Sequence, residues 1–596
     1  MNRSVARLSS TLAAVLLPAV LGVSALSAAD VTIAKRDGGW QLLSDGTPFE
    51  VKGAGGDASK ALLASLGANT CRTWGADGIQ DRLDDAQKNG LKVVVGIWLG
   101  HERHGFNWSD AGQVAKQFAM AKAQVEQWKN HPALLAWGLG NEMEGFKDGD
   151  NEAIWNGIEA IAKMTKELDP HHPTMTTTAE IGGQRIAMLN RLCPSIDIMG
   201  INSYGGAPSL PERYKKAGGT RPYIVTEYGP AGTWEIPKNA FGAVDEPTST
   251  AKGPVYLKTY QVLAKDPQCL GSIAFAWGAK IEATATWYGM VLPDESRLQA
   301  ADDLAGAWGK PVANHCPTIQ PLTLSQNSGL KPGDTITATA VIADAEKDQL
   351  KTEWLLASES SNYDGGGDVQ AAPPTYPEAI TASTSTTATI TLPASGGVYR
   401  VFAYVRDGKG GAAMANTTLK VDGPVLPPKP RKATLPVAII ADGKDSPWAN
   451  SGWMGDTAAI GMEAGSTVDP HSGKTCFAVT FSQDKGWGGV VWQSPANDWG
   501  SKPGGLNLTG AKRLAFWARG KEGGEKVKIG FGAIGKDKPY HDSAKGETEL
   551  ELTTTWTEYG IDLAGKDLSC IKSGFQWVVG GQGKPVTFYL DDVRWE

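Results

Sequence analysis

The sequence predicts a multidomain protein in which one α/β domain is followed by two all-β domains. Three observations indicate this organisation. Strand-like and helix-like segments alternate from Asp30 to about Cys316, a Thr- and Gly-rich stretch of alternating polar and apolar residues follows, and a Trp-rich region ends the chain. The 596 residues also exceed what one hydrophobic core holds, so several domains are expected.

The first 29 residues are expected to be a signal peptide and are excluded from the fold. Arg3 and Arg7 precede the apolar run 12–21, and small residues before Asp30 suit cleavage. The apolar run is too short for a permanent membrane anchor, and no later stretch reads as a membrane span. The mature protein is therefore expected to be periplasmic or secreted, without stable insertion into a membrane.

Eight short apolar segments between residues 30 and 316 are predicted to be strands of one parallel barrel. Between them lie amphipathic stretches such as 114–128, where apolar residues recur at helical spacing. Eight strands with helical crossovers fit a (β/α)₈ TIM barrel, whose functional site lies at the C-terminal ends of the strands. The predicted strands are residues 49–53, 69–74, 92–99, 134–142, 174–180, 196–204, 223–228 and 272–277.

Two β-domains are expected after the barrel. Residues 317–423 carry alternating runs without a helical stripe, which favours a small β-sandwich. Residues 424–436 include five prolines and are expected to form a stiff linker. Residues 437–596 combine further strands, Gly-rich turns and many Trp residues, which is typical of a jelly-roll β-sandwich.

Charge and composition narrow the class of partner. The net charge of −7 argues against a nucleic-acid partner, because nucleic acids require a basic face. The chain has 21 Trp, and flat indole faces suit sugar rings, although core packing accounts for most of them. The six widely spaced cysteines match no zinc pattern. Cys476 and Cys570 are a candidate disulfide, and free thiols are an equally good interpretation. Nothing in the sequence indicates an oligomeric state.

Two of the predicted strands deliver a glutamate at their C-terminal end. Asn141 and Glu142 end one apolar run, and Glu227 ends another. A barrel rim brings such strand ends together despite their separation in sequence. Glycoside cleavage needs one carboxyl group to protonate the leaving oxygen and another to meet the oxocarbenium-like centre, about 5–5.5 Å apart in retaining enzymes. The sequence therefore predicts a paired-carboxylate site that needs no redox cofactor and no catalytic metal.

The motifs around these glutamates resemble the retaining β-glycosidases of clan A. The barrel region most resembles the catalytic barrel of glycoside hydrolase family 2, over roughly half of the chain. Family 2 places β-domains before its barrel, whereas here the predicted signal segment precedes the barrel directly. The residues that carry the resemblance are Asn141-Glu142, Thr226-Glu227-Tyr228-Gly229, His131-Pro132, Trp137-Gly138-Leu139-Gly140 and Leu168-Asp169-Pro170.

The resemblance implies a double-displacement mechanism with three central residues. It implies that Glu142 is the general acid/base, that Glu227 is the nucleophile, and that Asn141 hydrogen-bonds the sugar 2-hydroxyl. The implied activity is an exported retaining β-glycosidase acting on a β-linked oligo- or polysaccharide, with β-glucan favoured because indole-rich clefts suit flat equatorial rings. For each glutamate, the structural alternative is a salt bridge to a neighbouring loop.

Five further residues are candidates for binding the substrate. The resemblance implies that Arg72 lies beside the nucleophile, that Tyr204 positions it, and that Trp277 forms the aromatic floor of the subsite at the cleaved bond. Trp98 lies near the end of the third predicted strand, His101 follows that strand, and both are expected to line the cleft. The structural alternatives are an ion pair for Arg72 and packing at the barrel rim for the others.

Three other functions remain open from the sequence. The same glutamate pair serves β-glucan transglycosylases, to which the segment around Glu227 is also similar. The stretch Gly53-Ala54-Gly55-Gly56-Asp57-Ala58 mimics a dinucleotide fingerprint after a strand, which would indicate an oxidoreductase. A carbohydrate-binding protein on a degenerate barrel is the non-enzymatic alternative, and the presence of both glutamates argues against it.

The end of the chain resembles a different kind of module. Residues 588–595 look like the last strand of galactose-binding-like carbohydrate-binding modules. Such modules often hold a structural Ca²⁺, for which Asp591 and Asp592 are candidate ligands. The middle domain resembles immunoglobulin-like or PKD-like spacers.

Overall fold

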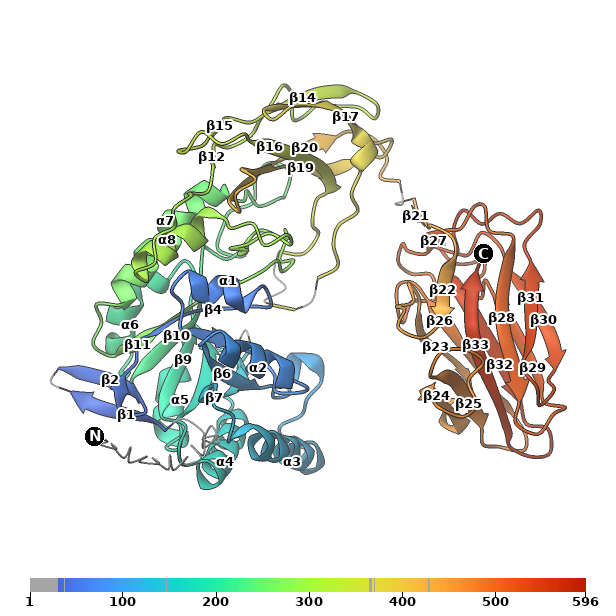
Figure 1. The fold of residues 1–596 in the computed structure, drawn as a ribbon, viewed down its shortest axis with the longest axis horizontal. Coiled ribbons are helices and arrows are strands. Elements are labelled where there is room, and N and C mark those ends of the chain that lie inside the picture. Colours follow the sequence, from blue (N-terminus) through green and yellow to red (C-terminus); the bar gives the residue numbers. More distant parts are fainter. Residues whose placement is uncertain (1–29, 37, 146, 364–366, 369, 427–428) are drawn as a thin grey trace, which may run out of the picture. The chain divides into compact units, whose positions relative to one another are not determined.

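The computed structural model describes residues 30–596 except 37, 146, 364–366, 369 and 427–428. The predicted signal peptide lies outside the described residues. The chain forms two compact units, one that ends at Pro424 and one from Val425 to Glu596 (Figure 1). Among the described residues, none of the helices has the length and apolar character needed to cross a bilayer.

Eight parallel strands close into a barrel in the first unit (Figure 1). Their order, β10-β11-β4-β5-β6-β7-β8-β9, follows the chain around the barrel. This arrangement confirms the predicted (β/α)₈ fold, with strand ends within a few residues of those expected. The strands are β4 (Val51–Gly55), β5 (Thr70–Arg72), β6 (Lys92–Ile97), β7 (Leu134–Asn141), β8 (Thr174–Ala179), β9 (Ile198–Asn202), β10 (Tyr223–Tyr228) and β11 (Cys269–Phe275).

Helices follow the barrel strands in alternation. The two longest begin at capping residues: the Asp110 carboxylate accepts hydrogen bonds from the N–H groups of Gly112 and Gln113, and the Asn151 side chain accepts one from Ala153. The helices are α1 (Lys60–Ser65), α2 (Gln80–Lys88), α3 (Ala111–Trp128), α4 (Glu152–Leu168), α5 (Arg185–Leu192), α6 (Leu210–Lys216), α7 (Ser249–Leu263) and α8 (Gln299–Ala307), with 3₁₀ turns η1 (Glu102–His104) and η2 (Ala207–Ser209).

An N-terminal antiparallel sheet packs against the end of the barrel where the strands begin. It consists of β1 (Val31–Arg36), β2 (Gly39–Ser44) and β3 (Thr47–Pro48). Val31 and Leu42 from this sheet are buried in one cluster with Val51, Val94 and Leu135 of the barrel strands. This sheet was not predicted from the sequence. It leaves the opposite end, where the strands finish, for the site.

The rest of the first unit is a β-sandwich, as predicted. Its sheets have the orders β13-β14-β18-β17 and β16-β19-β20, with the pair β12-β15 beside them. The elements are β12 (Thr318–Ile319), β13 (Thr323–Leu324), β14 (Thr335–Thr339), β15 (Ile342–Ala343), β16 (Lys351–Ser358), η3 (Pro377–Ala379), β17 (Ile380–Ser383), β18 (Thr387–Thr391), β19 (Gly397–Arg406) and β20 (Ala412–Val421).

Buried polar contacts join the sandwich to the barrel. The Arg400 guanidinium donates to the Glu359 carboxylate at 2.7 and 2.8 Å and to the Val244 carbonyl of the barrel domain at 2.7 Å. Asn416 donates to the Glu246 carboxylate at 2.6 Å. A buried charge that loses its partner costs about 3–5 kcal/mol. These contacts therefore make the barrel and the sandwich one unit.

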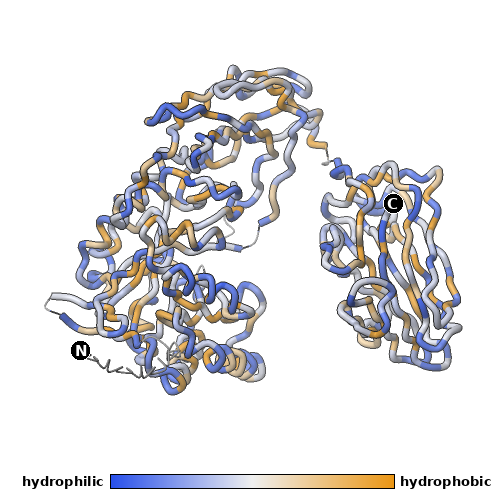
Figure 2. The backbone as a smooth tube through the Cα atoms, viewed as in Figure 1, coloured by the Kyte–Doolittle hydropathy of each residue, from blue (hydrophilic) through white to orange (hydrophobic). Residues whose placement is uncertain are grey.

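The second unit is a two-sheet β-sandwich. One sheet has the order β24-β25-β33-β28-β31 with β22 on β33, and the other has the order β23-β26-β32-β29-β30. Figure 2 shows hydrophobic and hydrophilic residues alternating along its strands, as expected for strands with one buried face. The elements are β21 (Arg431–Lys432), β22 (Val437–Ile440), β23 (Ala449–Gly455), η4 (Thr457–Ala459), β24 (Ile460–Ser466), β25 (Cys476–Phe481), β26 (Trp487–Gln493), β27 (Leu506–Asn507), β28 (Arg513–Gly520), β29 (Lys526–Phe531), β30 (Gly546–Glu551), β31 (Thr557–Asp562), β32 (Ser573–Gly580) and β33 (Val586–Trp595).

The six cysteines are free thiols. Cys476 and Cys570 do not form the candidate disulfide, so the free-thiol interpretation holds.

Candidate active site

A cleft of about 1390 Å³ lies at the C-terminal ends of the barrel strands. Its volume exceeds the roughly 300–1,000 Å³ of a typical small-molecule pocket. Aromatic and charged side chains share its wall. The predicted site residues that line it are Trp98, Asn141, Glu142, Tyr204, Glu227 and Trp277.

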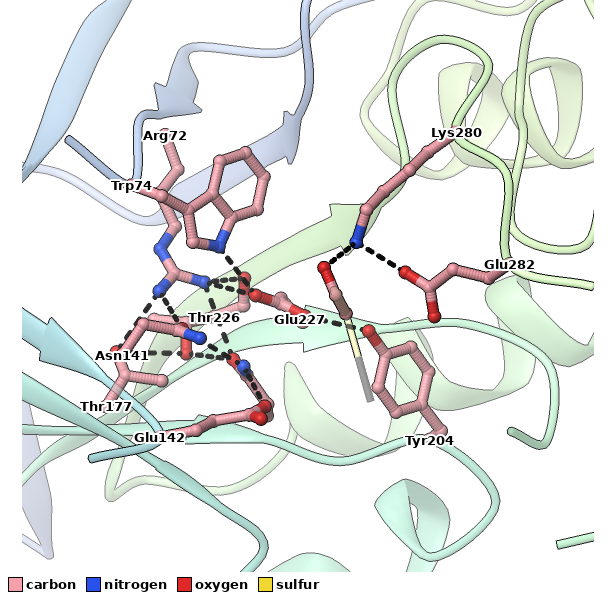
Figure 3. A network of polar contacts seen from close by, with 12 residues as sticks. Arg72, Trp74, Asn141, Glu142, Thr177, Tyr204, Thr226, Glu227, Lys280 and Glu282 are labelled. Carbon is pink, nitrogen blue, oxygen red and sulfur yellow. Dashed lines mark hydrogen bonds and ion pairs between the residues drawn. The ribbon is translucent and has the colours of Figure 1, made fainter. Parts of the chain in front are cut away.

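Glu227, on β10, is surrounded by hydrogen-bond donors (Figure 3). Its Oε1 accepts from Arg72 Nη1 and from the indole Nε1 of Trp74, both at 2.9 Å. Its Oε2 accepts from the Tyr204 hydroxyl at 2.7 Å. These three donors thus fix the orientation of the Glu227 carboxyl group on the cleft wall.

Tyr204 is suited to donate to this carboxylate. Burial, followed by the negative charge of Glu227, raises the pKa of the Tyr204 hydroxyl well above its usual value. The hydroxyl therefore keeps its proton at any ordinary working pH. Its hydrogen bond fixes the direction in which the second oxygen of Glu227 points.

Arg72, the last residue of β5, links the two predicted catalytic strands. It is buried and also donates to Asn141 Oδ1 at 2.6 Å and to the Thr226 carbonyl at 3.1 Å. Asn202, at the end of β9, donates to Asn141 Oδ1 at 3.2 Å and to Glu142 Oε1 at 2.6 Å. A single hydrogen-bonded network therefore runs from one glutamate to the other (Figure 3).

Glu142 directly follows β7, and its surroundings favour the protonated form. Its backbone adopts φ 54°, in the left-handed region that residues other than Gly rarely adopt, and its N–H donates to the Thr177 carbonyl at 2.8 Å. Burial, with the charge of Glu227 as the second cause, raises the pKa of the Glu142 carboxyl to about 8. Glu142 is thus protonated at neutral pH, while Glu227 is held by three donors. Two carboxyl groups in contrasting environments are the arrangement that acid and nucleophile roles require.

A comparison with known families identifies the barrel. Residues 87–260 match the family model described as "Glycosyl hydrolases family 2, TIM barrel domain". The matched segment contains both Glu142 and Glu227. The barrel is a clan A glycoside hydrolase barrel of the family 2 type.

Individual relatives match over shorter parts of the chain. A mannan endo-1,4-β-mannosidase F from Aspergillus clavatus is 31% identical over 136 residues, which is 20% of this chain and 30% of that protein. A β-glucuronidase from Sus scrofa is 26% identical over 185 residues, 28% of this chain and 26% of that protein. The chain thus spans less than a third of the length of these curated relatives.

Solved β-glucuronidase structures also align with the chain. The Ruminococcus gnavus β-glucuronidase aligns with 47% of this chain and 53% of its own, at 16% identity and a TM-score of 0.38. A Bacteroides uniformis β-glucuronidase aligns with 94% of this chain and 67% of its own, at 14% identity and a TM-score of 0.38.

The predicted aromatic residues of the family 2-type barrel differ in how they meet the cleft. Trp277 follows β11, is 1% exposed, and donates from its indole to the Ser59 carbonyl at 2.9 Å. Trp98 follows β6 and is 41% exposed. His101 is not among the described residues that line the cleft; it stacks on Trp98 with ring centroids 4.9 Å apart. Burial lowers the pKa of His101 to about 4, so its ring is neutral.

Three residues with direct roles in the geometry were missed from the sequence. Trp74 bonds Glu227, Asn202 bonds Glu142, and Trp234 lines the cleft with its indole 47% exposed. The first two could have been predicted from their place at the C-terminal ends of barrel strands. Asn202 ends the sixth strand, and Trp74 lies two residues beyond Arg72. Trp234 lies in a loop, where the sequence offers no periodicity to place it.

The glycine stretch that mimics a dinucleotide fingerprint serves the barrel instead. Gly56 has φ 146°, and a Cβ there would lie 2.1 Å from the Trp277 carbonyl oxygen. The Trp277 N–H donates to the Gly55 carbonyl at 2.7 Å, and the Ala58 N–H donates to the Trp277 carbonyl at 3.2 Å. These glycines therefore allow the loop after β4 to lie against the end of β11.

The two aspartates proposed as calcium ligands have protein partners. Asp591 is buried and accepts from the N–H groups of His471 and Ser472 at 3.0 and 3.2 Å. Asp592 contacts the His471 ring at 3.0 Å. These contacts occupy carboxylate oxygens that a calcium ion would need, and calcium binding at this place stays a prediction.

The elevated pKa of Glu142 predicts that this residue destabilises the folded protein as the pH rises. The pKa is 4.5 in the unfolded chain and about 8 in the folded protein. Folding thus takes up a proton between these pH values, and the free energy of unfolding falls as the pH rises from 4.5 to about 8. Glu142→Gln lacks this proton uptake. We expect its Tm to exceed that of the wild type by an amount that grows across this window, as measured by thermal unfolding. A Tm difference that is constant with pH would contradict the assignment.

Proposed function

We propose that this protein is an exported retaining β-glycosidase that hydrolyses β-linked oligo- or polysaccharides by double displacement. The observation that supports it is the pair of carboxyl groups on one cleft, one protonated by burial and one held by three donors. The family 2-type barrel supports the same chemistry. The proposed location is the periplasm or the outside of the cell, and no nucleic-acid partner is proposed.

In the first step, Glu227 attacks the anomeric carbon. A bond forms between that carbon and a carboxylate oxygen, the glycosidic C–O bond breaks, and the Glu142 proton passes to the leaving oxygen. In the second step, Glu142, now ionised, takes a proton from water while the water oxygen attacks the same carbon. The bond to Glu227 breaks, which regenerates the carboxylate and releases a sugar of retained configuration.

Each binding residue has a defined role in this scheme. Arg72 and Trp74 hold one oxygen of Glu227 and Tyr204 holds the other, so the attacking oxygen is oriented before substrate binds. Asn141 is held by Arg72 and Asn202 beside both glutamates, where its amide would contact the sugar 2-hydroxyl.

The proposed substrate is a β-linked chain of several sugars. The cleft volume and the exposed indoles of Trp98 and Trp234 support a multi-sugar substrate. These two residues follow β6 and β10, which stand opposite each other in the barrel. We place β-glucan first because flat equatorial rings suit indole faces. Mannan is the second candidate, because the name of the Aspergillus relative includes that polysaccharide.

The second unit is proposed to be a carbohydrate-binding module. Three Trp side chains on it are exposed: Trp453, Trp487 and Trp499. A module tethered to the enzyme would raise the local concentration of polysaccharide. Sedimentation of the full-length protein with insoluble polysaccharide, with and without added calcium, measures both the binding and any need for the ion.

The experiment that tests the function is a substrate panel. The full-length protein is incubated with β-glucans, mannan and aryl β-glycosides, and product sizes and anomeric configuration are followed by chromatography and NMR. Shorter products of retained configuration support a retaining hydrolase, and longer products indicate transglycosylation by the same glutamates. Binding without any bond cleavage would indicate the non-catalytic alternative.

The pH dependence of turnover follows from the state of Glu142. Its carboxyl must carry a proton for the first step, and its pKa in the free enzyme is about 8. We expect kcat/KM to fall tenfold per pH unit above about pH 8. Initial rates measured across this range on a substrate with a poor leaving group check the prediction, and a flat profile to pH 10 would contradict it.

A further inference from the structure

The β-sandwich of the first unit contributes to the wall of the substrate cleft. Asp368 and Gly367 lie between β16 and η3 of the sandwich, and both line the cleft that holds Glu142 and Glu227. The Asp368 carboxylate accepts from Arg103 Nη2 at 3.0 Å and contacts the His104 ring nitrogen Nε2 at 3.1 Å. A side chain of the sandwich thus contacts the guanidinium of Arg103 and the ring of His104, both on η1 of the barrel.

Described residues on both sides of Asp368 contact the barrel. Before it, the Tyr363 carbonyl accepts from the Thr233 hydroxyl, and the Lys238 ammonium lies 5.3 Å from the centre of the Tyr363 ring. Next to it, the Gly367 carbonyl accepts from Lys280 Nζ at 3.0 Å. After it, Gln370 Oε1 accepts from the Ala283 N–H at 3.1 Å. The position of Asp368 is therefore set by contacts with several barrel loops.

A series of ring contacts leads from the Asp368 partners to an exposed indole. The His104 ring lies 5.5 Å from the His101 ring, and the buried His101 ring stacks on Trp98 at 4.9 Å and 28°. Trp98 itself lines the cleft and is 41% exposed. An indole held on one side and open on the other is suited to stack against a sugar ring. Asp368 acts on that indole only through the residues of η1.

We propose that Asp368 is a positioning residue for the substrate cleft, so that the β-sandwich sets the affinity for extended sugar chains. By holding Arg103 and His104, Asp368 fixes η1 and thereby the Trp98 face on which a sugar unit of the chain stacks. This inference rests on the proposed function. It gives the sandwich, which looks like a spacer in the sequence, a part in substrate selection.

The test uses the full-length protein and two matched substitutions. Asp368→Asn keeps the shape of the side chain and removes its charge. Asp294→Asn is the control: Asp294 also pairs across the barrel–sandwich contact, with Arg406 at 2.5 Å, and its side chain has the same 44% exposure as that of Asp368. Asp294 is not among the described residues that line the cleft.

We expect Asp368→Asn to raise KM for an oligosaccharide about three- to tenfold while kcat at saturation stays within about twofold, because the substitution loosens binding and leaves the glutamate pair untouched. The ratio of kcat/KM for the oligosaccharide to that for an aryl β-glycoside should fall by the same factor. Asp294→Asn should keep the wild-type ratio. Trp98→Ala should lower the ratio as well, and the double variant should lose no more than Trp98→Ala alone, since both changes act at one place.

Three results would overturn the inference. They are an unchanged ratio in Asp368→Asn, equal losses on both substrates accompanied by a lower Tm, and additive losses in the double variant with Trp98→Ala. Oligosaccharide affinity measured by calorimetry separates this inference from the proposed function. If the wild type binds oligosaccharide without cleaving it, the hydrolase proposal fails, and a weaker affinity in Asp368→Asn but not in Asp294→Asn still supports the role of Asp368.

Discussion

Glu227→Ala is expected to lower kcat by about 10⁴-fold or more, equal to at least about 5.5 kcal/mol of barrier height. The loss is large because the substitution removes the only atom that forms the covalent bond in the first step, and no donor around it can take over. Arg72, Trp74 and Tyr204 supply protons or positive charge, not a nucleophile. Steady-state kinetics on an aryl β-glycoside measures the effect.

A small external nucleophile distinguishes this loss from a folding defect. Azide fits the space left by the carboxyl group and would attack the anomeric carbon, giving a glycosyl azide of inverted configuration. Glu180→Ala is the matched control, because Glu180 also follows a barrel strand but pairs with Arg213 at 2.6 Å and is absent from the described lining of the cleft. It should retain near-wild-type turnover. Turnover above about a tenth of wild type in Glu227→Ala would end the nucleophile assignment.

Glu142→Ala is expected to lower turnover about 10²–10⁴-fold on substrates with poor leaving groups, the range that one general acid or base contributes. The size of the loss should depend on the leaving group. An activated dinitrophenyl group departs without a proton, so the first step survives, and the glycosyl-enzyme accumulates because no base activates water. A burst of dinitrophenol followed by slow turnover is the expected time course.

Azide again gives a specific readout for Glu142→Ala. It is already an anion and needs no general base, so it should accelerate the second step and give a product of retained configuration. The opposite configurations of the two azide products, one for each variant, assign the two roles independently. An equal loss on good and poor leaving groups, with no azide effect, would show that Glu142 is not the acid/base.

Much of the barrel could be predicted because its strands and helices show in the pattern of neighbouring residues in the sequence. The buried strands of a parallel barrel are short apolar runs, and the helices between them repeat apolar residues at helical spacing. Glu142 and Glu227 could be predicted to line one cleft because each directly follows or ends such a run. The family 2-type resemblance of the barrel is confirmed by the match over residues 87–260.

The remaining features depend on contacts between residues far apart in the chain. Val31 and Leu42 of the N-terminal sheet pack against the barrel strands, and this packing depends on shape and burial. The strands of that sheet are too short for their sequence pattern to predict it. The contacts of Asp368 could not be predicted either, because its partners Arg103 and His104 lie more than 260 residues away. The pKa of Glu142 likewise depends on how deeply the folded cleft buries it, which no local pattern records.

The buried hydrogen bonds of Arg400 and Asn416 also limit how this chain can be shortened or recombined. A truncation after the last barrel helix, α8, would remove the donor to the Val244 carbonyl and one of several donors to the Glu246 carboxylate. It would also expose to water the barrel residues Leu292 and Leu298, which pack against Phe402 of the sandwich. A gene fusion or an exchange of catalytic modules would therefore have to keep residues 30–424 together and join the new partner after Pro424.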